Sequence, residues 1–160
     1  MKIFIAMLAG GLAFGALPAR AETPAAETPA PTAQYAPELA DIMTTAQWRH
    51  LKLSYAGALH NWTLAEFEVG QMRKSFAAAS KHYPEYENVP VAALIEKFSA
   101  PALADLDKAI HAKDAGGFFK AFERLNAACN SCHQSAGRPF IKIRTPTSSP
   151  FSNQVFRPEN

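Results

Sequence analysis

Apolar residues recur at helical spacing along most of the chain between residues 38 and 137. In the first stretch, from Glu38 to about His60, a 4-3-4-3 spacing predicts one helix face that carries Leu39, Met43, Ala46, His50, Leu53, Gly57 and His60. No segment shows the sustained alternation of apolar and polar residues that is typical of a half-buried β-strand. The pattern therefore predicts an all-α fold.

Capping residues and prolines divide the rest of this stretch into three further helical regions. The second helix follows Asn61, a typical N-cap residue, and the last helix follows Asp114 and stops at Gly137. Between them, a third region over residues 91–113 is expected to break or kink near Pro101. Four helical regions with short connections predict an antiparallel four-helix bundle.

Side-chain type predicts which parts of these helices are buried. The acidic residues Glu66 and Glu68 are expected on a solvated helix face, because charged side chains are rarely buried. The large aromatic side chains are expected to fill the core or to form the walls of a cofactor pocket, a set comprising Trp48, Trp62, Phe67, Phe118, Phe119 and Phe122.

The first 21 residues have the features of an export signal. Lys2 precedes an apolar run over residues 3–17, and Ala19-Arg20-Ala21 matches a small-x-small cleavage site. The apolar run is short for a membrane span. We expect an exported, periplasmic protein that starts at Glu22 and has no membrane span after cleavage; an uncleaved N-terminal anchor is the alternative.

Composition and charge define the remaining segments. Residues 22–37 are rich in Ala, Pro and Thr and predict a linker, which leaves residues 38–137 as one small domain. Residues 138–160 predict an irregular tail, whose apolar residues suggest that it packs on the bundle. Loss of the signal peptide leaves 14 basic against 14 acidic residues, and this balance gives no reason to expect a nucleic-acid partner.

Both cysteines of the chain fall in one short motif near the end of the last predicted helix, Cys129-Asn-Ser-Cys132-His133. A redox pair normally gains its low thiol pKa at a helix N-terminus, which is the wrong end here. A structural zinc site normally needs a second pair of ligands, and the sequence offers no second C-x-x-C and no H-x₃₋₅-H. The third interpretation is covalent haem attachment, for which C-x-x-C-H is the signature.

Helical spacing suits that third interpretation. Residues three and four apart share a helix face, so Cys129 and Cys132 can both reach the vinyl groups of one porphyrin. On the same face, His133 can bind the iron through an imidazole nitrogen. The motif thus predicts one covalently attached haem c held by these three residues.

Together, the export signal, the four predicted helices and the ACNSCH motif in the last one resemble the class II c-type cytochromes, the family of cytochrome c′ and its low-spin relatives. The resemblance covers the bundle and implies a haem near one of its ends and pairing of two copies through the first two helices. The chain departs from the family in its long tail, where Arg138 is a candidate partner for a haem propionate and a solvated surface position is the alternative.

The expected function depends on the sixth position of the iron. Met43 lies about five residues into the first helix, at the axial level expected for His133, whereas His50 lies roughly 10 Å further along the axis. Low-spin members of the resembled family take a methionine from the first helix. Met43 is therefore the candidate sixth ligand, with His50 or an open position as alternatives.

These alternatives separate two functions. A filled position favours one-electron transfer between redox protein partners, and an open one favours the binding of small gases such as NO or CO. A peroxidase-like haem enzyme is a third and weakest alternative, because the sequence shows no distal acid–base pair. With no Ser/His/Asp grouping or Gly-rich phosphate loop either, enzymatic activity is not expected.

Overall fold

The computed structural model describes residues 35–158, and this part of the chain is helical with no β-strand. It contains the α-helices Leu39–Ala58 (α1), Trp62–His82 (α2), Val91–Leu94 (α3), Ala100–His111 (α4) and Ala115–Ser135 (α5), with a π-helical stretch, Ile95–Ser99 (η1), between α3 and α4. The predicted all-α fold is thereby confirmed. The predicted signal peptide and most of the predicted linker lie outside the described residues and stay predictions.

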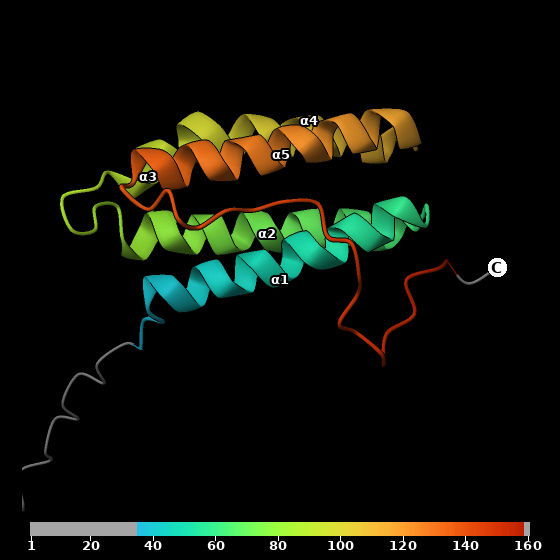
Figure 1. Cartoon of the computed structure of the whole chain (residues 1–160), viewed down its shortest axis with the longest axis horizontal. Coiled ribbons are helices and arrows are strands. Elements are labelled where there is room, and N and C mark those ends of the chain that lie inside the picture. Colours follow the sequence, from blue (N-terminus) through green and yellow to red (C-terminus); the bar gives the residue numbers. More distant parts are fainter. Residues whose placement is uncertain (1–34, 159–160) are drawn as a thin grey trace, which may run out of the picture. The chain divides into compact units, whose positions relative to one another are not determined.

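The long helices lie side by side along their lengths (Figure 1). α1 packs on α2, α4 packs on α5, and α2 also contacts α4. Two predicted caps are present: the Asn61 side chain accepts a hydrogen bond from Leu64 N at 3.1 Å, and the Asp114 side chain accepts one from Gly117 N at 3.0 Å. Each cap satisfies a backbone N–H that a helix start would otherwise leave without a partner.

The third helical region is continuous through Pro101, where the sequence predicted a break or kink. α3, η1 and α4 follow one another without a gap, and the turn before Pro101 widens into π-helical geometry. Proline has no backbone N–H, and its ring clashes with the carbonyl of residue i−4, which here is Lys97. A wider turn accommodates both effects, so the helix continues with a local distortion.

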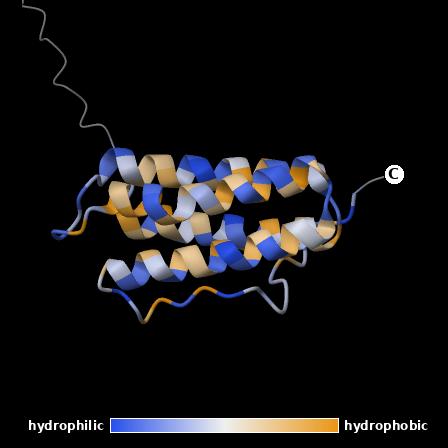
Figure 2. Ribbon diagram, turned by 90° about the horizontal axis from the view of Figure 1, so that it is seen from above, coloured by the Kyte–Doolittle hydropathy of each residue, from blue (hydrophilic) through white to orange (hydrophobic). Residues whose placement is uncertain are grey.

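The buried side chains are mostly apolar. Figure 2 shows apolar and polar residues alternating along the helices, as expected for helices with one buried face. At the end that holds the α1–α2 and α4–α5 turns, the side chains of Leu53, Leu106, Phe118 and Phe122 are at most 1 % exposed. Gly57 of α1 lies directly against the Phe118 ring, where an added Cβ would collide with it. This glycine therefore permits the close packing of α1 on α5 at that end.

Some sequence expectations for single side chains are wrong. Trp48, Phe67 and Phe119, expected in the core, are about half exposed, whereas Phe118 and Phe122 are buried as predicted. Glu68, expected on a solvated face, is 1 % exposed and pairs with Arg49 at 3.3 Å. The α1–α2 interface encloses this carboxylate, and the arginine compensates its charge, which makes its burial tolerable.

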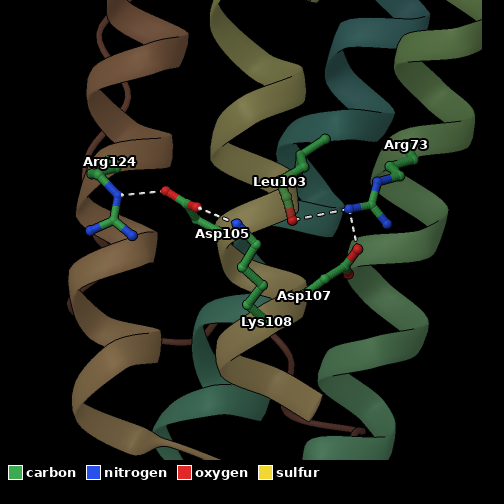
Figure 3. Close-up of polar contacts among 6 residues, drawn as sticks. All are labelled: Arg73, Leu103, Asp105, Asp107, Lys108 and Arg124. Carbon is green, nitrogen blue, oxygen red and sulfur yellow. Dashed lines mark hydrogen bonds and ion pairs between the residues drawn. The ribbon is translucent and has the colours of Figure 1, made fainter. Parts of the chain in front are cut away.

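Polar contacts connect α4 to the helices on both sides (Figure 3). Arg73 of α2 donates to the Leu103 carbonyl at 3.0 Å and also pairs with Asp107. On the other side, Arg124 of α5 bonds Asp105 at 3.0 Å. Because these side chains are partly exposed, each pair contributes little to stability, on the order of 0–1 kcal/mol. They fix the placement of α4 more than they add to its stability.

Two further observations complete the fold. None of the helices among residues 35–158 is both long enough and apolar enough to span a membrane. As far as Pro158, the segment after α5 forms neither helix nor strand. It runs back alongside α5 (Figure 1), to which it is hydrogen-bonded. Its aromatic residues contact α1: Phe151 lies 5.3 Å from Trp48 and Phe156 lies 5.5 Å from Tyr55, measured between ring centroids.

Candidate functional site

A cavity of about 400 Å³ lies at the end of the helical unit where α1 begins and α5 ends. α1, α2, the α3–η1 segment, α5 and the tail all contribute to its walls, which are mostly apolar. All of the residues selected from the sequence line it: Met43, His50, Cys129, Cys132, His133 and Arg138. Helices from distant parts of the sequence thus bring these residues together around one space.

The two cysteines form part of the α5 wall and are not joined by a disulfide. Burial, together with the neighbouring Cys132, raises the pKa of the Cys129 thiol to about 12, and burial also raises the pKa of Cys132. A reactive redox cysteine needs a lowered pKa, because the thiolate is the nucleophile. The surroundings of the pair therefore favour neutral, buried thiols and argue against thiol–disulfide chemistry.

His133 stands beside them with one ring nitrogen already engaged. Its Nδ1 lies 3.0 Å from the backbone carbonyl oxygen of Ile141 in the tail. A carbonyl oxygen can only accept, so Nδ1 carries a proton, and in a neutral ring Nε2 then keeps its lone pair. An imidazole held in this way is in the tautomer that binds a metal through Nε2.

A hydrogen bond between α1 and α5 fixes which residues of the two helices lie at the same level. His50 Nε2 lies 2.7 Å from Asn126 Oδ1. The start of α1 and the end of α5 both line the cavity. A step of seven residues back from His50 along α1 and a step of seven forward from Asn126 along α5 therefore both lead toward the cavity. These steps reach Met43 and His133, each about 10 Å from the His50–Asn126 contact.

His50, the alternative ligand, is buried and held in a network of its own. Its ring lies 4.5 Å from that of Phe122, between centroids. Burial lowers the pKa of His50, opposed by its hydrogen bond to Asn126 and by the charge of Glu123. Because its Nε2 donates to Asn126, this nitrogen is not free to bind a metal.

Arg138 lies at the cavity wall, with its guanidinium engaged by other groups. It pairs with Glu87 at 2.6 Å and donates to the Ala136 carbonyl at 3.0 Å. A guanidinium has five N–H donors, so further acceptors can still bind. Lys142 and Arg144, which follow it in the tail, are exposed.

Sequence reasoning missed the asparagines and the tail residues of this site. Asn126 and Asn130 lie four residues apart on α5 and hydrogen-bond tail residues Thr145 and Ile143. The only signal in the sequence was a pair of asparagines four residues apart in the last helix. Their partners are 13 to 19 residues away, and no local pattern identifies them.

The cavity suits a haem in size and in the chemistry of its walls. Its volume falls within the range typical of cofactor and ligand pockets, roughly 300–1,000 Å³. Cys129, Cys132 and His133 share one wall, and Met43 is at the matching level of another. Within residues 35–158, no three His, Cys, Asp or Glu side chains gather to hold a metal ion, so a zinc site with protein ligands alone has no support there.

Comparison of the sequence with protein-family models and with curated proteins, and of the chain with solved structures, gave no match.

Proposed function

We propose that this protein is a periplasmic monohaem c-type cytochrome, similar to the class II family, that carries single electrons between redox protein partners. The observation that carries the proposal is the cavity at one end of the helices. Residues of the CNSCH motif line one of its walls, and Met43 lines another. A chance C-x-x-C-H sequence has no reason to coincide with an apolar, haem-sized space. We further propose that the helices form the antiparallel four-helix bundle of that family, with the tail packed on it.

Each wall residue has a role in this proposal. Cys129 and Cys132 hold the haem through thioethers, and His133 binds the iron through Nε2. Met43 is the sixth ligand, because it lies at the level of His133, while His50 lies two turns away and donates its Nε2–H to Asn126. Arg138 lies where it can add a propionate to its existing contacts. When bound, the haem supplies an iron that accepts and donates one electron.

The protein contributes a dry environment and fixed ligands. Apolar walls exclude water, and two ligands held on packed helices limit the rearrangement that accompanies a change of charge. A His/Met pair also raises the reduction potential relative to a His/His pair, which suits an electron carrier. We propose no enzymatic activity, because His50 donates its Nε2–H to Asn126 and, among residues 35–158, no carboxylate lines the cavity to act with it as an acid–base pair. From the resemblance to the class II family, we also propose that two copies of the chain pair through α1 and α2.

Absorption spectra test this function. The mature protein is produced with haem-maturation machinery and measured oxidised, reduced and in the presence of carbon monoxide. We expect a low-spin spectrum with the weak far-red ferric band of methionine ligation and little response to carbon monoxide. A high-spin spectrum that changes promptly with carbon monoxide would indicate an open site and a gas-binding function. A low-spin spectrum without the methionine band would indicate His50.

A further inference from the structure

The tail forms a row of three hydrogen-bonded contacts with one face of α5. Asn126 Nδ2 donates to Thr145 Oγ1 at 2.8 Å, and His133 Nδ1 donates to the Ile141 carbonyl at 3.0 Å. Between them, Asn130 contacts Ile143. The helix residues increase in number along the row while the tail residues decrease, so the tail runs in the opposite direction to α5.

The spacing of this row matches on both sides. Asn126, Asn130 and His133 are four and three residues apart and share a helix face, with steps of about 6.0 and 4.5 Å along the axis. Their partners are two residues apart, and alternate residues of an extended chain point to the same side at intervals of roughly 6.6 Å. Small adjustments therefore allow all three contacts to form together.

Asn130 fixes the register of the tail. Its Nδ2 donates to the Ile143 carbonyl at 2.9 Å, and its Oδ1 accepts from the Ile143 N–H at 2.8 Å. One side chain thus satisfies both backbone groups of one residue. A shift of the tail by a single residue would break both bonds and reverse which side chains face the cavity. At present Ile141 and Ile143 line that cavity.

The last contact of the row reaches the candidate iron ligand. Groups that hydrogen-bond the outer nitrogen of a ligating histidine fix its tautomer and ring orientation and increase its basicity. A more basic imidazole stabilises ferric iron over ferrous iron and lowers the reduction potential. The Ile141 carbonyl occupies this place for His133, and Ile141 is only two residues from the Asn130–Ile143 anchor.

We infer that Asn130 is a positioning residue for the haem site: it anchors the tail at Ile143 so that the Ile141 carbonyl holds His133 and sets the reduction potential. This inference rests on the proposed function, since it concerns the same iron ligand. It assigns the tail a role in the chemistry of the site, in addition to covering one side of the helices.

The test compares the haem-loaded wild type with Asn130→Ala in the full-length mature chain. We expect haem attachment to persist and the ferric–ferrous equilibrium to move about tenfold toward ferrous, an upward shift of the midpoint potential of about 59 mV for one electron. Proton NMR should show faster solvent exchange of the His133 Nδ1–H. Asn153→Ala is the matched control, because Asn153 is an exposed tail asparagine. It should change neither reading.

A second variant covers the case in which Asn130→Ala fails to fold. Replacing Lys142 by the corresponding α-hydroxy acid turns the Ile141 carbonyl into an ester, a weaker acceptor, and keeps every side chain. It should raise the potential in the same direction. Unchanged potentials and an unchanged Nδ1–H signal in haem-loaded variants would overturn the inference. A wild type without haem would refute the proposed function itself, and the inference with it, which the spectrum reveals before any variant is made.

Discussion

The two ends of the helical unit share α1, α2 and α5, yet side chains fill only one of them. At the turn end, which holds the α1–α2 and α4–α5 turns, Gly57 lets the Phe118 ring lie against α1, and Leu53 and Phe122 close the remaining space. At the cavity end, the first turns of α1 and the last turns of α5 help to line a partly open cavity of about 400 Å³. Side chains pack closely at the turn end, whereas the cavity end leaves space between them.

The difference shows which part of the fold has room for an additional group. Protein interiors are normally packed without large voids, because an empty space forfeits dispersion contacts on every side. A largely apolar cavity of this size is instead typical of a site for a ligand or cofactor. The residues around it include Cys129, Cys132 and His133, which are the residues that would attach a haem.

The largest expected effect comes from removing the attachment residues at the cavity end. Cys129→Ala combined with Cys132→Ala should abolish covalent haem. It should also lower the free energy of unfolding by about 3 kcal/mol or more, the stabilisation given by a ligand at a hundred times its Kd. Intact mass and thermal melting measure the two effects. Ser131→Ala, between the cysteines, is the control and should keep both; loss of haem in the control would contradict a specific role for the thiols.

At the turn end, the expected loss is in packing alone. Leu53 is fully buried, so Leu53→Ala should reduce the free energy of unfolding by about 2–5 kcal/mol, with or without haem. Urea denaturation of both forms measures it. Val155, 75 % exposed, provides the control Val155→Ala, which should change the value by less than about 0.5 kcal/mol. A Leu53→Ala effect that depended strongly on haem would show that the two ends are not independent.

Met43 should behave differently from a core residue. It is half-buried at the cavity, so Met43→Ala should cost the haem-free protein only about 1 kcal/mol. In the haem-loaded protein, the same change should remove the far-red methionine band and allow rapid binding of carbon monoxide. Met72→Leu is the matched control, because Met72 also lines the cavity and leucine conserves its volume. A methionine band that survived in Met43→Ala would exclude Met43 as the sixth ligand.

The smallest expected effect concerns pH and the buried histidine between the two ends. Burial holds the pKa of His50 below its ordinary value of 6.5, so the unfolded chain takes up this proton at a higher pH than the folded chain. The free energy of unfolding should therefore be unaffected by His50 above about pH 6.5 and should fall as the pH decreases below it. In His50→Gln this part of the pH dependence should disappear.

Denaturation of the haem-free protein between pH 7 and pH 5 measures this slope. The control is His111→Gln, because the His111 side chain is 65 % exposed. A slope that is the same in His50→Gln and wild type would show that His50 is not held neutral by its surroundings.

The comparison also explains how much the sequence alone can predict. Local signals were sufficient for the helix face that contains His50 and Leu53 and for the caps Asn61 and Asp114, because each depends on neighbours within a few residues. The CNSCH motif likewise selected three residues that lie together on the cavity wall. His60 was predicted on the same helix face but is not part of it, because α1 ends at Ala58 and His60 is exposed in the following turn.

What the sequence could not predict depends on contacts between distant segments. The burial of Glu68 requires Arg49 on another helix, and the anchoring of the tail requires Asn130 to meet Ile143. Such pairs leave no periodic trace in the chain. The cavity is also invisible in the sequence, because it results from how closely α1 approaches α5 at each end.

The central claim is that this cavity holds one haem bound covalently at Cys129 and Cys132. The most direct measurement is the intact mass of the denatured mature protein after production with haem-maturation machinery. The account predicts the mass of the chain plus one haem, and a haem that stays with the chain through acid-acetone extraction. A mass equal to that of the chain alone, or a haem removed by extraction, would contradict it.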